Sequence, residues 1–530
     1  MLKLLNSLSR DLLLDSKKVS SNVAVFMAIV TIGKVMGILR DRQQAIHFGA
    51  HTAESIAFAQ ASVLPRTILE IMFSAAFSAS LIPVFVTRME QKGKEAAYNL
   101  AALFMFFVAA FTILFSAIGV LFAYPLFHLS LGNAELPYGT IVLGANLLRI
   151  MFPMMIFSGF AFSFASILQA LGEFRITAAM SLVSNGIVLV YYFFFLERFG
   201  IYGLAVSFLI GFAAQGLIQI PFLAKHKFRF RLKLDIKDPG LRQIWHLTLP
   251  ALAASWIVPV NVLVNARAAA QLYGGQYGLN AIYYAHSLYA IISGVFIFAV
   301  ANVVFPKLVR LGANDNKAGY SSTLLATVKA VFFALIPLTA LVVALSRQIV
   351  GLIFGGGLFG ERAVEITSTA LAFYAPGIVG YGLMMILCRA CFALHDGKTP
   401  FLSAVIAIFV NGALSFLLAP FMLVAGPALA NAAGSSVGAI MLLGVLSKKS
   451  VLPFSERLLV DILKMLAAGG LVFVAVRFVG GFLHDFGAVV QLFVPAAVGC
   501  LVYLACTLVL KLDEAQWVKR KLLYSRLKSE

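Results

Sequence analysis

The sequence predicts an all-α polytopic membrane protein with fourteen transmembrane helices, which form two parallel six-helix lobes plus two extra C-terminal helices. Three observations support this prediction: an apolar composition, apolar runs of about 20 residues separated by short basic segments, and an internal repeat. Of the 530 residues, 61% are hydrophobic and only 12% are charged, and the mean hydropathy is +0.95. These values exclude a water-soluble protein.

The length of the apolar runs indicates helices, since a membrane β-barrel would show alternating strands of about 10 residues. Segments 55–87 and 139–170 are too long for one straight crossing, and they contain Pro65 and Pro153. We therefore expect tilted or kinked helices there. The fourteen predicted spans are 22–40, 55–87, 96–123, 139–170, 176–196, 201–224, 244–272, 280–305, 321–345, 364–388, 400–419, 421–446, 458–482 and 487–510.

Residues 1–21 precede the first span and mix leucines with basic residues. This pattern fits a short amphipathic helix on an anionic membrane surface and, equally well, a frayed tail. The first apolar run contains Lys34 and lacks a small-residue cleavage pattern. We therefore expect it to stay in the protein as a transmembrane helix.

The distribution of Lys and Arg predicts the orientation in the membrane. With an even number of spans, both termini lie on one side, and the segments on that side contain 29 basic residues against 6 in the opposite connections. The positive-inside rule then makes both termini cytoplasmic. This topology also explains the net charge of +19, so the charge does not indicate a nucleic-acid partner.

Two proline-containing segments recur at an offset of 223 residues. Phe77–Pro83 resembles Val300–Pro306, and Pro153–Arg175 resembles Pro376–Lys398, with the prolines and an acid-x-base loop in matching places. The offset joins spans that are six crossings apart. The two halves therefore have parallel topology, related by an axis along the membrane normal.

These observations divide the chain into six parts and predict a transporter. Two lobes that face each other imply a central cavity and alternating access. ATP hydrolysis is not predicted, because the glycine-rich segment 355–361 lacks the Gly-Lys-Ser/Thr of a phosphate-binding loop. The parts are an N-terminal amphipathic segment (1–21), an N-lobe (22–224), a basic cytoplasmic linker (225–243), a C-lobe (244–446), the last two spans (447–511) and a basic cytoplasmic tail (512–530).

Six basic residues lie inside the predicted spans and need an explanation, because a Lys or Arg at mid-bilayer costs about 2.5–3.5 kcal/mol. Lys329 and Lys464 are expected to reach the interface with their long side chains. The other four fit a wet central cavity, with three on the first lobe and one on the second. They are Lys34, Arg66, Arg149 and Arg267.

A basic cavity suits an anionic substrate, and arginine suits phosphate through its planar fork of donors. Glu70 follows Arg66 by one helical turn, so a structural ion pair is an alternative for these two residues. Glu70 is also the only carboxylate well inside a span, which disfavours a carboxylate-based cation or drug exporter. The candidate substrate-binding residues are Lys34, Arg40, Asp41, Arg66, Glu70, Arg149, Arg267 and His286.

An enzyme is not predicted, because the sequence shows no paired-carboxylate, Ser-His-Asp or metal-binding constellation facing one side. We expect no metal and no cofactor. The expected driving force is the membrane potential, alone or with a coupling cation. The four cysteines all lie in apolar runs and are interpreted as packed free thiols.

Several stretches carry a family resemblance. They are Thr31–Asp41 with Phe48-Gly49, Leu148–Pro153, Tyr283–Ala285 with Phe305-Pro306, Leu352–Leu371, and Arg389–Pro400. The last is similar to the pattern Arg-Ala-Phe-Tyr-Ala-Leu-x-Asp-x-x-Thr-Pro. Together these stretches resemble the MviN/MurJ family of the multidrug/oligosaccharidyl-lipid/polysaccharide exporter superfamily. The sequence departs from the family patterns at Lys34, Arg66, Leu69, Ser74 and Ser287.

The resemblance implies a flippase in the bacterial inner membrane that moves lipid II, the undecaprenyl-diphosphate-linked peptidoglycan precursor, to the outer leaflet. A flippase for another polyprenyl-diphosphate-linked saccharide and a small-molecule exporter of the superfamily are the alternatives. The implied partners are the lipid-linked diphosphate glycan, membrane lipids, and cell-wall synthesis or division proteins. The resemblance also places a groove for the lipid tail beside residues 458–510.

Overall fold

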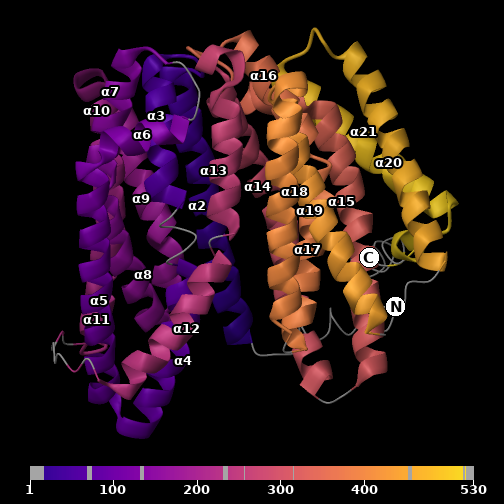
Figure 1. The fold of residues 1–530 in the computed structure, drawn as a ribbon. Helices are drawn as coiled ribbons and strands as arrows, with labels where there is room; N and C mark the ends of the chain where they lie inside the picture. Colours follow the sequence, from indigo (N-terminus) through magenta and orange to yellow (C-terminus); the bar gives the residue numbers. More distant parts are fainter. Residues whose placement is uncertain are drawn as a thin grey trace. The chain divides into compact units, whose positions relative to one another are not determined.

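The computed structural model is built from α-helices. It describes residues 17–67, 74–131, 136–228, 230, 235, 237–255, 257–313, 316–394, 396–449, 451, 456–516 and 520. Residues 1–16 of the predicted N-terminal amphipathic segment, Glu70 and most of the C-terminal tail lie outside the described residues. Within each half, long helices run side by side along one direction (Figure 1).

In the first half of the chain, each predicted span overlaps one helix or two consecutive helices. These are α2 Lys17–Phe48, α3 Ala53–Thr67, α4 Ser74–Lys92, α5 Lys94–Leu121, α6 Ala123–Leu131, α7 Tyr138–Met151, α8 Met154–Ala170, α9 Phe174–Phe194, α10 Leu196–Leu217 and α11 Ile220–Lys225.

The second half continues in the same way. Its helices are α12 Pro239–Ser255, α13 Ile257–Ala270, the 3-10 turn η2 Leu272–Gly275, α14 Gly278–Ala313, α15 Lys317–Phe354, α16 Glu361–Tyr374, α17 Gly377–Ala393, α18 Lys398–Met422, α19 Ala425–Lys448, α20 Glu456–Phe482 and α21 Ala488–Val509.

The all-α membrane class is confirmed. Among the described residues, nine helices are long and apolar enough to cross a membrane, and α16 with α17, which meet at a bend of 44°, make a tenth if the pair forms one span. The other four predicted spans, 22–40, 55–87, 244–272 and 280–305, are also helical where they are described. The total of fourteen crossings agrees with this arrangement and stays a prediction.

The internal repeat is visible in the helix boundaries. Both bounds of α16 and both bounds of α17 fall 223 residues after those of α7 and α8. In each pair the break lies at a proline, Pro153 or Pro376, which lacks a backbone N–H and clashes with the preceding helical turn. The kink expected at Pro153 is therefore found, and its counterpart recurs in the second half.

The repeat also extends to ion pairs between loops. The Glu173 carboxylate, after α8, lies 3.1 Å from Lys225 Nζ at the end of α11. In the second half, the Asp396 carboxylate, after α17, lies 2.5 Å from Lys449 Nζ at the end of α19. In both halves, an acidic residue in the loop after a helix thus forms an ion pair with a lysine at, or directly after, the C-terminal end of a later helix.

Packing divides the described chain into two compact units, which differ from the predicted lobes. The first unit comprises residues 17–280 and 357–359, and the second comprises 281–356 and 360 onward. Span 7 belongs to the first unit because α12 packs on α4 and α5. The Trp245 ring of α12 lies 6.5 Å from Phe104 and 6.4 Å from Phe107 between centroids. The lobe boundaries of the sequence repeat stay a prediction.

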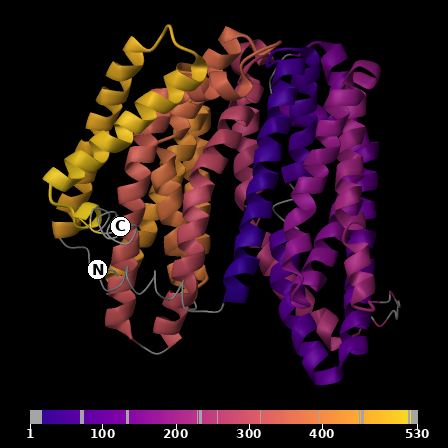
Figure 2. The same cartoon turned by 180° about the vertical axis from the view of Figure 1, so that it is seen from behind.

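In the second unit, α15 packs against α16, α17, α20 and α21. The helices α20 and α21 form an adjacent pair, drawn in yellow in Figure 2. Their buried residues Ala468, Val472 and Tyr503 pack on Ala344 and Leu345 of α15. On outer faces, large side chains such as Phe194 and Phe421 are 76% and 81% exposed, as suits contact with lipid tails.

Candidate functional site

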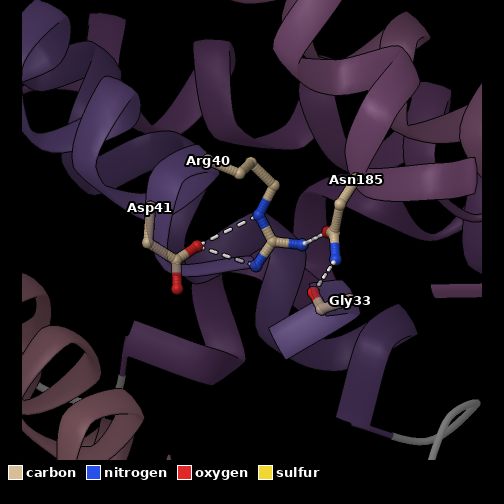
Figure 3. Close-up of polar contacts among 4 residues, drawn as sticks. All are labelled: Gly33, Arg40, Asp41 and Asn185. Carbon is tan, nitrogen blue, oxygen red and sulfur yellow. Dashed lines mark hydrogen bonds and ion pairs between the residues drawn. The ribbon is translucent and has the colours of Figure 1, made fainter. Parts of the chain in front are cut away.

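The charged turn of α2 is held by a polar network that reaches α9 (Figure 3). Arg40 Nε and Nη2 donate to Asp41 Oδ1 at 3.1 and 2.7 Å. Arg40 Nη1 donates to Asn185 Oδ1 at 2.8 Å, and Asn185 Nδ2 donates to the Gly33 carbonyl at 3.1 Å. The guanidinium of Arg40 is therefore fixed on all three of its nitrogens.

Close packing of α2 on α9 makes this network possible. A Cβ on Gly33 would lie 2.5 Å from Ser181 Oγ, so the glycine lets the two helices approach each other. Asn185 and Asp41 are 7% and 3% exposed. Buried polar groups at membrane depth are costly unless they are paired, so this network stabilises the position of Arg40.

Arg40 and Arg66 share one aromatic neighbour. Their guanidinium carbons lie 5.3 and 5.5 Å from the centroid of the buried Phe208 ring on α10. A cation over a ring is attracted by the ring quadrupole, by about 0.5–2 kcal/mol. Arg40 of α2 and Arg66 of α3 therefore both lie near the Phe208 ring. The predicted partner of Arg66, Glu70, lies outside the described residues.

Arg149 and Arg267 are exposed on helices that pack on α3. Arg149 Nη1 donates to Asn146 Oδ1, one turn earlier on α7, at 2.8 Å. The helix α13, which carries Arg267, contacts α3 through Ala266. The five cationic candidates therefore belong to the same compact unit, although Arg267 was predicted to lie on the second lobe.

Four of these cations lie at comparable depths. Lys34 and Arg40 precede the end of α2 at Phe48, whereas Arg66 and Arg149 follow the starts of α3 and α7. At a rise of about 1.5 Å per residue they lie roughly 12–21 Å from those helix ends. In the predicted topology these ends face the outside of the cell, and we therefore expect the four charges to lie well inside the bilayer.

His286 has different surroundings. It belongs to α14 in the second compact unit, where its ring lies 5.7 Å from Tyr374 and 5.9 Å from Tyr289 between centroids. Tyr289 in turn stacks on Tyr374 at 5.4 Å. The structure thus gives His286 aromatic packing partners within the second unit.

Lys329 was expected to reach the membrane interface, and this expectation was wrong. Its residue is only 7% exposed, and its ammonium forms an ion pair with Asp461 of α20. Lys464, the other basic residue with that expectation, is part-buried and donates to the Leu510 carbonyl at 3.3 Å. Neither partner could be identified from the sequence, because each lies on a separate helix.

The second unit also contains an apolar groove of about 580 Å³ between α15, α17, α19 and α20. Its lining is aliphatic and aromatic apart from Thr339 and Ser436. In the part of the chain that the structure describes, no three His, Cys, Asp or Glu side chains are grouped to hold a metal ion. The four cysteines are free thiols, as interpreted from the sequence, but Cys500 is exposed and is therefore not packed in the core.

Comparison with known proteins identifies the family. The family model described as lipid II flippase MurJ matches residues 45–497. The chain belongs to this family. A probable lipid II flippase MurJ from Vibrio cholerae is 25% identical over 464 residues, which cover 86% of this chain and 88% of the relative. A lipid II flippase MurJ from Burkholderia cenocepacia is 23% identical over 439 residues, covering 81% and 84%.

Solved structures with a similar fold include a member of the same family and a multidrug transporter. A lipid II flippase MurJ in an inward closed conformation matches with a TM-score of 0.78 and 22% identity, covering 92% of this chain and 98% of that structure. An inward-facing multidrug resistance transporter of the MATE family matches with a TM-score of 0.69, 14% identity, and coverage of 81% and 98%. The resemblance found in the sequence is confirmed: the chain is a multi-pass membrane protein of a transporter family, not an enzyme.

Sequence reasoning missed two residues that contact the cationic candidates, namely Asn185 and Phe208. A signal for Asn185 was present, since a polar amide inside an apolar span is expensive unless it has a partner. Phe208 gave no such signal, because the span 201–224 is rich in aromatic and aliphatic residues.

Proposed function

We propose that this chain moves lipid II, an undecaprenyl-diphosphate-linked peptidoglycan precursor, from the inner to the outer leaflet of the bacterial inner membrane by alternating access. The observation that carries the proposal is the gathering of Arg40, Arg66, Arg149 and Arg267 on adjacent helices of one unit of a lipid II flippase family member. We propose these four, with Lys34 and Asp41, as the surface that binds the diphosphate.

The chemistry of the substrate matches this surface. A diphosphate presents several anionic oxygens, and arginine donates to such oxygens in pairs. Arg149 and Arg267 are exposed, so their guanidinium groups can reach a ligand. Arg40 is held by Asp41 and Asn185, and in this proposal it supplies a fixed positive potential more than free donors.

The apolar groove of the second unit supports a lipid-linked substrate. We propose that it holds part of the polyprenyl tail, as the resemblance implied for the region beside residues 458–510. Lipid tails are as apolar as the groove, so moving a tail into it gains little free energy. The groove would therefore guide the tail and leave affinity to the headgroup.

The orientation and the driving force are also part of the proposal. Both termini are placed in the cytoplasm by the 29-to-6 distribution of basic residues. The membrane potential, alone or with a coupling cation, would drive the anion outward. Membrane lipids surround the protein, and cell-wall synthesis or division proteins are the proposed protein partners.

Depletion of the protein in its host tests the substrate. Lipid II should accumulate on the inner leaflet while other polyprenyl-diphosphate saccharides keep their distribution, as measured by leaflet-specific labelling and mass spectrometry of extracted lipids. Accumulation of a different lipid-linked saccharide with normal lipid II would favour the alternative flippase. Normal distribution of every lipid-linked precursor would contradict the proposal.

A further inference from the structure

A buried carboxyl group outside the proposed anion surface has no hydrogen-bond partner. Glu514 follows α21 in a helical turn of residues 513–516 and is 5% exposed. No other described residue donates a hydrogen bond to either of its carboxylate oxygens, although its own backbone N–H lies close enough to favour the ionised form. The neighbouring Asp513 is about half exposed and forms an ion pair with Arg457 at 3.6 Å, so only Glu514 turns inward.

Among the described residues, the charged groups that act on Glu514 include Lys329 and Asp461 on two neighbouring helices. Lys329 of α15 and Asp461 of α20 form an ion pair whose side chains are 9% and 13% exposed, and both interact electrostatically with Glu514. Tyr503 of α21 interacts with it as well, and its hydroxyl is also buried without a partner. With Lys329 already paired to Asp461, an ionised Glu514 would leave a buried negative charge uncompensated.

Protonation of the Glu514 carboxyl removes this uncompensated negative charge. A protonated carboxyl is neutral, so its burial leaves no negative charge without a counter-charge. Burial is the largest effect and raises the pKa of the Glu514 carboxyl; its own backbone N–H and Lys329 oppose this rise, and Asp461 and Asp513 add smaller increases. The charge balance and the burial thus point in the same direction.

The turn that carries Glu514 supports the wall of the apolar groove. Leu512 and Ala515 pack with Met465 of α20 and with Ile336 of α15 in one buried cluster. Ile336 also lines the groove, together with Ile462 and Leu466 of α20. Undocking of the turn would therefore remove packing from one side of the groove.

We propose that Glu514 is a proton-binding site and that its proton keeps the turn 512–516 docked on α15 and α20. Glu514 ionises more easily when the turn is undocked and exposed to water than when it is docked. Docking is therefore strongest at low pH and weakens as the pH rises from the ordinary pKa of a glutamate, about 4.3, to that of the docked group. The inference does not depend on which lipid the protein moves.

Two measurements on the full-length protein in nanodiscs test the site. Infrared difference spectra between acidic and alkaline pH should contain a protonated-carboxyl band that Glu514→Gln removes. Amide hydrogen exchange of the peptide covering residues 510–516, corrected for the intrinsic effect of pH, should accelerate about tenfold for each unit by which docking raises the pKa. Glu514→Gln, a neutral isostere, should stay protected at all pH values.

Glu456→Gln is the matched control, since Glu456 is an exposed acid at the start of α20. It should leave both the infrared band and the pH-dependent exchange as in the wild type. Asp513→Asn should move the midpoint slightly lower and reduce the amplitude slightly, because it removes a nearby negative charge that raises the pKa of the docked carboxyl. An infrared band unchanged by Glu514→Gln, or exchange of wild type and Glu514→Gln with the same pH dependence, would overturn the proposal.

Discussion

Asn185 illustrates how one amide can order a charged site. Its carbonyl oxygen accepts from Arg40 and its amide nitrogen donates to the Gly33 carbonyl, so both ends of the side chain are used. A hydrogen bond to a charged group is worth about 1.5–3 kcal/mol, and a buried partner left unsatisfied costs a similar amount. We therefore regard Asn185 as the residue that positions Arg40.

Replacement of Asn185 should reveal this role. Asn185→Leu leaves Arg40 Nη1 without its acceptor, so we expect a loss of about 1–3 kcal/mol in stability, measured by thermal denaturation in detergent. Asn185→Asp keeps the acceptor for Arg40 and loses only the donor to Gly33, so its loss should be smaller. Equal losses for both variants would show that the contact with Arg40 is not the important one.

Arg149 is the sharpest test of the proposed diphosphate surface, because its side chain is exposed and its removal leaves no buried group unpaired. Arg149→Ala should abolish complementation of a flippase-depleted strain while membrane abundance stays near wild type. Arg149→Lys should restore function only in part, since a point charge loses the paired donors of the guanidinium. Arg198→Ala, at an exposed arginine of α10 in the same unit, is the control and should complement fully. Complementation by Arg149→Ala at native expression would exclude Arg149 from the site.

At the level of elements, equivalent loops of the two halves form the same kind of ion pair with different residues. Asp396 accepts from Lys449 and from the backbone N–H and hydroxyl of Thr399, which together hold the pKa of its carboxyl far below the usual range. Bonds from Lys225 and His226 lower the pKa of Glu173 in the same way. Asp396 is the better buried of the two acids, so the second half should depend more on its pair.

The Asp396 pair should contribute to stability in a pH-dependent way. Because its pKa is lowered in the folded protein, the contribution is complete above the ordinary pKa of an aspartate, about 3.9, and is lost as the pH falls toward the folded value. Asp396→Asn should therefore lower stability by about 1–2 kcal/mol at neutral pH, and the difference from wild type should shrink in acid. Glu173→Gln should cost less than about 1 kcal/mol, because its lysine partner is exposed. A larger loss for Glu173→Gln would contradict this ranking.

At the scale of the whole molecule, alternating crossings determine where reporters should appear. The predicted topology puts Pro137, before α7, outside and Lys237, before α12, inside the cell. Reporter fusions at these two positions should give opposite signals, with the outward-active reporter functioning only after Pro137. Matching signals would contradict the predicted number of crossings between them.

The membrane potential should act on the proposed transport step directly. Moving one charge across 100 mV changes the free energy by about 2.3 kcal/mol, so a diphosphate with two negative charges gains up to about 4.6 kcal/mol on leaving a negative interior. In vesicles of defined orientation without pH or sodium gradients, collapse of the potential should slow outward flipping. An unchanged rate would exclude direct electrical driving.

Much of this architecture was predictable from the sequence because its causes are local. Apolar runs define helices wherever they occur, since backbone groups in lipid must be satisfied within the segment. Prolines mark breaks through their own geometry, which is why the pairs α7–α8 and α16–α17 could be expected from Pro153 and Pro376. The family resemblance likewise rests on short contiguous motifs such as Arg389–Pro400.

The tertiary structure alone decided which polar groups meet. Arg40 donates a hydrogen bond to Asn185, and ion pairs join Lys329 to Asp461 and Glu173 to Lys225. In each case the two partners are far apart in the sequence. Within lipid there is little hydrophobic force to choose a partner helix, so shape and polar contacts make the choice. The same reason explains why α12 packs on α4, although the repeat assigned α12 to the other lobe. It also explains why the sequence identified most residues of the proposed anion surface but not Asn185 and Phe208, which contact them.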